Sequence, residues 1–118
     1  MKLHLVLVAC ALVVASCGGS SSAPAGPAAD RQIILSGVAF SPTTVSIKAG
    51  QTVQWVWQSG RHDVTSGSAC TADGKFSSGA PKSDGDFIKK FDTPGEYPFF
   101  CTPHCVSAGM MGKVVVTP

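Results

Sequence analysis

The chain has 118 residues, a formal net charge of +2, only 14% charged residues and five cysteines. This length leaves room for a single domain. There is no run of basic residues, no interleaving of basic with aromatic residues and no acidic tail, so the charge pattern gives no support to nucleic-acid binding.

The first residues have the pattern of an export signal. Lys2 is followed by a run of Leu, Val and Ala that is too short to span a bilayer. The end of this run, Val14-Ala15-Ser16-Cys17, resembles the lipobox of bacterial lipoproteins, in which the cysteine becomes the lipidated first residue. We therefore expect a signal peptide over residues 1–16 and lipidation of Cys17. The alternative is ordinary signal cleavage near the same place, which would leave a free thiol close to the new terminus.

A flexible tether is expected over residues 17–30. Gly18–Ala29 consists of Gly, Ser, Pro and Ala without hydrophobic periodicity, and a dozen such residues reach about 20 Å. Several acyl chains on Cys17 would anchor the protein stably, whereas one chain binds a membrane only marginally. The expected location is the bacterial cell envelope, where a membrane-anchored lipoprotein would face the periplasm or the cell exterior.

The remaining residues, 31–118, are predicted to form one all-β domain. No stretch of ten or more residues has apolar side chains at helical spacing, whereas several short segments alternate apolar and polar residues. The expected strands are Gln32–Leu35, the segment around Val45 and Ile47, Val53–Trp57, Phe87–Phe91, Glu96–Cys101 and Lys113–Thr117. Gly and Pro punctuate them, which predicts a Greek-key β-sandwich or small barrel of about seven or eight strands.

A long stretch between Gly60 and Asp86 is rich in Gly, Ser and Asp. We interpret it as a loop, and a loop of this length in a small domain is either disordered or functional. It contains His62 and Cys70, which favours a function.

Four side chains in residues 31–118 form the set used by trigonal copper sites. Such a site takes two imidazole nitrogens, one thiolate and commonly a weak axial thioether. Cys101 and His104 are three residues apart around a proline, and Gly109 allows the chain to fold back so that a methionine, Met110 or Met111, can reach the same ion. His62 is the second histidine of this region. Taken singly, His62 could be a solvated loop residue and Met110 an ordinary core residue.

The sequence around these residues resembles that of the plastocyanin family. The resemblance is carried by Glu96–His104 and by Gly109–Val114, and earlier by Phe40-Ser41-Pro42, the Gly50 turn, Val53 with Trp55 and Trp57, and His62-Asp63-Val64. It implies a cupredoxin domain with one copper ion held by His62, Cys101, His104 and Met110. It also implies a blue copper protein that shuttles single electrons between Cu(I) and Cu(II) and meets redox partners transiently, as a monomer and not as an enzyme.

Two features depart from the family pattern. His104 and Met110 are six residues apart, one more than in the common plastocyanin loop, so Met111 is an alternative axial ligand. We favour Met110, because Gly-Met-x-Gly-Lys is the motif of the family and adjacent side chains of an extended segment point in opposite directions. Asp63 stands where plastocyanins usually carry Asn, whose hydrogen bonds tie the two ligand loops together and tune the metal.

The cysteines outside the ligand set are expected to pair. In an exported protein two spare thiols usually form a disulfide, which predicts a bond between Cys70 and Cys105. Its loop length predicts a stabilisation of about 3 to 4 kcal/mol. The alternative is that Cys101 pairs with one of these two, which would leave the rest of the ligand set without a purpose.

Three other functions are consistent with parts of the sequence. A copper storage or delivery protein in the periplasm would use the same ligands, with a looser and more exposed site that releases Cu(I). A binuclear copper site is suggested by Cys101-x-x-x-Cys105, but it requires a histidine where this chain has Gly109. A metal-free adhesive sandwich is the third. For an electron carrier, the expected exit face is an apolar collar around His104 made by Pro103, Ala108, Met111 and Ala80-Pro81.

Overall fold

The computed structural model of the chain describes residues 28–118. The expected signal peptide and the expected lipidation site, Cys17, lie outside the described residues, and so does most of the expected tether. Nine strands and one short helix follow in chain order: β1 (Arg31–Ser36), β2 (Ala39–Ser41), β3 (Thr44–Lys48), β4 (Gln51–Trp57), β5 (Thr65–Ser68), β6 (Thr71–Ser77), β7 (Asp86–Phe91), β8 (Gly95–Phe100), α1 (Cys105–Ala108) and β9 (Met111–Thr117).

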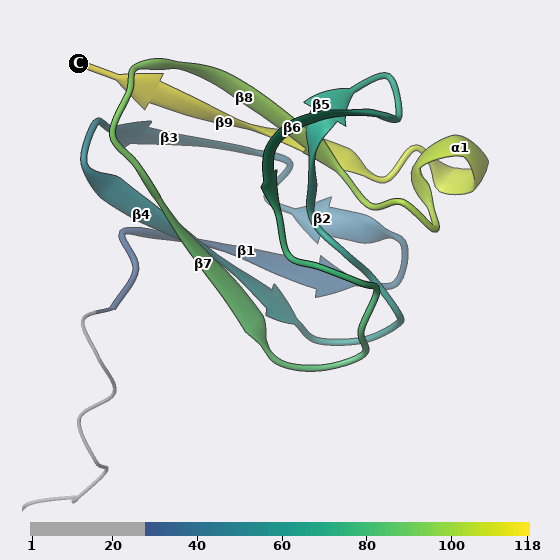
Figure 1. Cartoon of the computed structure of the whole chain (residues 1–118). Coiled ribbons are helices and arrows are strands. Elements are labelled where there is room, and N and C mark those ends of the chain that lie inside the picture. The colour runs from purple at the N-terminus through teal and green to yellow at the C-terminus, as the bar shows by residue number, and fades with distance from the viewer. Residues whose placement is uncertain (1–27) are drawn as a thin grey trace, which may run out of the picture.

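The strands form two mixed sheets that pack face to face (Figure 1). One sheet has the order β2-β1-β4-β7, in which β1 and β4 are parallel. The other has the order β3-β9-β8-β5-β6, in which β3 and β9 are parallel and the remaining neighbours are antiparallel. The predicted all-β sandwich is confirmed, with nine strands in the described residues where seven or eight were expected.

The core lies between the sheets and follows the alternation of the sequence. In β4, Val53, Trp55 and Trp57 are buried while the residues between them are only partly covered, as the period of two predicts. Burial of each large apolar side chain contributes about 1.5 to 3 kcal/mol. Trp55 packs edge-on against Phe99 of β8, with ring centroids 5.3 Å apart, and thereby joins the two sheets at the centre of the core.

A β-hairpin occupies the stretch that we expected to be a long loop. β5 and β6 pair with each other, and Thr65 and Ser66 of β5 pair with Phe100 and Phe99 of β8, so the hairpin extends the second sheet. Its composition is poor in strand-forming residues, and this explains why the sequence pattern did not indicate strands. Inside the hairpin the Ser66 hydroxyl accepts from the Phe76 N–H and donates to Asp73.

The short helix α1 directly follows His104. It is capped by Gly109, whose φ of 64° is left-handed and whose N–H donates to the Cys105 carbonyl at 2.9 Å. A turn of four residues has no room for helical periodicity, so the sequence could not indicate it. In Figure 1, α1 lies at one end of the sandwich, whereas β1 begins near the other.

No helix among the described residues is both long enough and apolar enough to cross a membrane.

Candidate metal centre

The four predicted ligands come from three segments that meet at the α1 end of the sandwich. His62 follows β4, Cys101 directly follows β8, and His104 and Met110 flank α1. The peptide N–H of Cys101 donates to the Met110 carbonyl at 3.0 Å, and the N–H of Met110 donates to the His104 carbonyl at 3.2 Å. The ligand loop is therefore closed by its own backbone.

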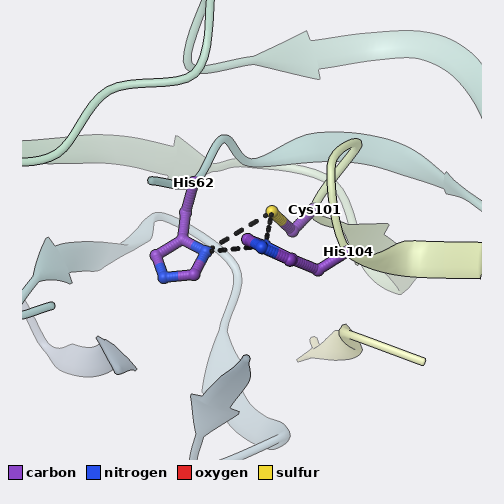
Figure 2. Close-up of side chains that lie close together, drawn as sticks. All are labelled: His62, Cys101 and His104. Atoms are coloured by element: carbon purple, nitrogen blue, oxygen red, sulfur yellow. Dashed lines mark hydrogen bonds between the residues drawn. The ribbon is translucent and has the colours of Figure 1, made fainter. Parts of the chain in front are cut away.

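Three ligand atoms form a nearly equilateral triangle. The Nδ1 atoms of His62 and His104 are 3.2 Å apart, and the Cys101 Sγ lies 3.6 Å from the first and 3.5 Å from the second (Figure 2). The centre of such a triangle is about 2 Å from each corner, which matches the length of bonds from imidazole nitrogen to a transition metal. The three side chains also form the group that can hold a metal ion in this part of the chain.

The orientation of the His62 ring is fixed by a backbone carbonyl. Its Nε2 lies 2.8 Å from the carbonyl oxygen of Ser59, which can only accept a hydrogen bond. In the neutral ring Nε2 therefore carries the proton, and the lone pair of Nδ1 faces Cys101 and His104. A partner of this kind on the second ring nitrogen is typical of metal-binding histidines.

Burial and charge both act on the thiol of Cys101. Cys101 and His62 are fully buried, whereas His104 is half-buried. Burial raises the pKa of the Cys101 thiol above its ordinary value; the negative charge of Asp63 also raises it, and the backbone N–H groups of Asp63 and His104 lower it. Binding of a metal cation consequently has to displace the thiol proton.

The structure separates the two candidate axial methionines. Met110 is 2% exposed and belongs to the core cluster beside Cys101, whereas Met111 begins β9 and is 43% exposed. Adjacent residues of an extended segment point opposite ways, so only one of them can face the triangle. Met110 therefore lies on the inner side with Cys101, and Met111 faces outward.

Asp63 joins the two ligand loops, as its position next to His62 predicts. It is buried, and its Oδ1 accepts a hydrogen bond of 2.6 Å from the backbone N–H of Thr102, the residue after Cys101. The carboxylate thus makes the link expected for Asn, and in addition it brings a negative charge next to the thiolate.

The disulfide holds the β5–β6 hairpin against the ligand loop. Cys70 and Cys105 are bonded with Cα atoms 5.7 Å apart, and Cys101 is the free cysteine of the described residues. This bond rules out a second bridging thiolate at Cys105, which the binuclear alternative requires. At the turn between β5 and β6, Ala69 and Cys70 have φ values of 50° and 59°, a conformation that usually selects Gly or Asn.

An all-β sandwich with two imidazole nitrogens, one thiolate and one thioether at one end defines the class of mononuclear copper proteins called cupredoxins. The donor set supports copper, because softer sulfur ligands together with imidazole favour it over hard cations. The family described as copper binding proteins, plastocyanin/azurin family, matches residues 32–117. The chain belongs to this family.

Individual relatives agree with the assignment. The chain is 38% identical over 84 residues to the chloroplastic plastocyanin of Tetradesmus obliquus. The aligned region covers 65% of this chain but only 57% of the plastocyanin. It is 30% identical over 100 residues to amicyanin-alpha of Methylorubrum extorquens, covering 84% of this chain and 82% of the relative. A purple cupredoxin from Nitrosopumilus maritimus superposes with a TM-score of 0.63 at 26% identity, covering 75% of this chain and 100% of that one.

Some contacts at the site could not be expected from the sequence. The Ser59 carbonyl is a backbone group, so no residue type indicates its role. Gly60 gives a weak signal, because a glycine two residues before a ligand is consistent with a close approach of backbone and ring. A Cβ atom at Gly60 would lie 2.6 Å from the Nε2 of His62.

We expect Gly60→Ala to weaken Cu(II) binding by about 10-fold or more, which is the usual cost of disturbing the partners of a ligand. The added methyl would displace the ring of His62 and break its hydrogen bond to Ser59. Competition with a chelator of known affinity measures the change.

Gly79→Ala is the matched control. Gly79 has a φ of 90°, close to the 86° of Gly60, and an added Cβ there meets nothing within 4 Å. Both variants should lose about 1 to 3 kcal/mol of stability from the left-handed backbone. Equal affinity losses in the two variants would contradict the steric explanation.

Proposed function

We propose that the protein carries single electrons by means of one copper ion held by His62, Cys101, His104 and Met110. The observation that carries this proposal is the triangle of two Nδ1 atoms and one Sγ, with sides of 3.2 to 3.6 Å. When bound, copper would supply a one-electron couple between Cu(I) and Cu(II).

The surrounding side chains favour electron transfer over catalysis. His62, Cys101 and Met110 are buried, so they shield the ion from water and from a substrate. Four protein ligands also leave no open position, whereas catalytic metal sites keep one. The protein's own contribution is to hold the ligands in place and to control access.

The half-buried His104 is the ligand nearest to the surface, and we assign the exit of the electron to it. The loop around it exposes Pro103 and Ala108, and Val106 of α1 is 90% exposed. Met111 and Ala80 are also exposed and Pro81 is half-buried, so these members of the expected apolar collar are accessible at the surface. Redox partners that meet such a face bind with small, transient interfaces.

A spectrum of the purified domain with one equivalent of Cu(II) tests the proposal. We expect one bound ion, an intense blue absorption from thiolate-to-copper charge transfer and a narrow copper hyperfine splitting in electron spin resonance. Cys101→Ser should abolish the blue absorption. Binding of Cu(I) alone, with no blue colour in the Cu(II) form, would support storage or delivery in place of electron transfer.

A location in the cell envelope is supported by the sequence pattern and by the disulfide. The lipobox-like Val14–Cys17 supports lipidation at Cys17, and the bond between Cys70 and Cys105 fits an oxidising compartment. The proposed place is the bacterial cell envelope, with the domain tethered to a membrane by residues 17–30. Mass spectrometry of the full-length protein from bacterial membranes should show acyl chains on Cys17, and Cys17→Ala should release the protein from the membrane.

A further inference from the structure

His62 lies in a segment with little regular structure. It is paired with one residue, Lys82, through an isolated bridge in which each backbone N–H donates to the other's carbonyl at 2.9 Å. Cys101 and Met110, by contrast, directly border the central strands β8 and β9. The position of the first ligand therefore depends on contacts from outside its own segment.

A side chain of the core supplies one of these contacts. The Nε1–H of Trp57 donates to the carbonyl oxygen of His62 at 2.8 Å. Trp57 is the last residue of β4 and is 6% exposed, so its indole is held by the packed sheet. The carbonyl of His62 consequently accepts two hydrogen bonds, one from the Lys82 backbone and one from the core.

Lys82 closes the cluster. Its ammonium lies 4.4 Å from the centroid of the Trp57 ring, a distance at which a cation and an aromatic face attract each other. The same ammonium donates to the Asp86 carbonyl at 2.9 Å, at the start of β7. Trp57, His62 and Lys82 therefore contact each other in a closed ring, which is connected to β4 on one side and to β7 on the other.

A second tryptophan shows that the Trp57 contact is more than the packing of an aromatic ring. Trp55 lies two residues earlier on the same strand and is fully buried, but its Nε1 has no hydrogen-bond partner among the described residues. The core thus tolerates an indole without using its N–H at position 55. At position 57 the N–H reaches the backbone of a metal ligand.

We propose that Trp57 is a positioning residue for the copper site, acting through the backbone of His62 together with Lys82. The inference rests on the proposed function, because His62 must be a copper ligand for its position to matter. Loss of the indole N–H removes the hydrogen bond that joins the His62 carbonyl to the core and leaves Lys82 as the remaining donor to that carbonyl. This loosens one corner of the triangle and weakens the binding of Cu(II).

The test compares Trp57→Phe with Trp55→Phe, which delete the same atoms from the same strand. With Cu(II) as the probe, we expect Trp57→Phe to bind about 10-fold more weakly than the wild type, at the lower end of the usual effect of such partners. We also expect its hyperfine splitting to change. Trp55→Phe should keep the affinity and the spectrum of the wild type, whatever its effect on thermal unfolding.

Two further measurements keep the assignment falsifiable if Trp57→Phe folds poorly. Lys82→Met removes the ammonium but keeps every backbone contact, and it should weaken Cu(II) binding by a smaller factor than Trp57→Phe. In the metal-free wild type, the indole N–H of Trp57 should exchange with solvent more slowly than an exposed indole. Equal losses of Cu(II) affinity in Trp57→Phe and Trp55→Phe, or no loss of affinity in either variant, would overturn the assignment. Absence of the blue Cu(II) form in the wild type would overturn the proposed function itself.

Discussion

The double variant Cys70→Ser with Cys105→Ser is expected to unfold with a free energy about 4 kcal/mol lower than the wild type. The disulfide closes a loop with a sequence separation of 35, and the chain-entropy estimate for that length gives this value. Both cysteines are replaced together, because a single replacement would leave a free thiol next to the copper ligands.

Thermal unfolding of the metal-free domain measures this effect. A loss of 4 kcal/mol corresponds to a fall in Tm of about 15 to 30 °C for a domain of this size. Wild-type protein unfolded in the presence of a thiol reductant should show the same fall, and the reductant should not change the double variant. A Tm within about 5 °C of the wild type would contradict the prediction.

Hydrogen exchange should locate the loss in the structure. The turn residues Ala69 and Cys70 have left-handed φ values without the glycine that such a turn favours, so the bond to Cys105 holds the hairpin in place. In the double variant, the exchange of amides in β5 and β6 should become faster than in the wild type. The exchange of amides in β4, which is central in the other sheet, should change less.

Asp63→Asn is expected to raise the reduction potential of the copper site by about 60 to 120 mV. The carboxylate lies beside Cys101, and its negative charge adds to the negative charge of the thiolate. Two negative charges next to the metal stabilise Cu(II) more than Cu(I), because Cu(II) carries the larger positive charge. Asn keeps an oxygen that can accept from the Thr102 N–H and removes only the charge. A 10- to 100-fold change in the ratio of Cu(II) to Cu(I) affinities corresponds to this range.

Cyclic voltammetry at neutral pH measures the potential, and Asp84→Asn serves as the control. Asp84 is exposed, so water and salt screen the charge that this substitution removes. The potential of Asp84→Asn should stay near that of the wild type. An unchanged or lower potential in Asp63→Asn would show that the carboxylate does not act through its charge.

The sequence predicted a group of His62, Cys101 and His104, because these residue types together form one chemical signal, and the structure brings the three side chains together. Cys101 and His104 have a spacing typical of one ion, and His62 is the second histidine of the folded region. The choice between Met110 and Met111 needed the structure, since it depends on how the extra loop residue is absorbed. In the structure the helix α1 lies between His104 and Met110, and Met110 is buried.

Other features could not be predicted because long-range contacts determine them. The β5–β6 hairpin has a composition typical of loops, and it is held by pairing with β8 and by the bond between Cys70 and Cys105. The alternation in β4 predicted that Trp55 and Trp57 are buried, but not that only one of their indoles reaches a ligand. The contact of Ser59 with His62 uses a carbonyl that every residue has.

The triangle of His62, Cys101 and His104 is already set at bonding dimensions by contacts of the protein itself. Ser59, Thr102 and the disulfide hold the parts of the site from different sides. Ligands fixed in this way cannot relax far toward the geometry that each oxidation state would choose in water. For the proposed electron carrier this would keep the reorganisation energy of the redox step small, so that an electron could leave within a brief encounter with a partner.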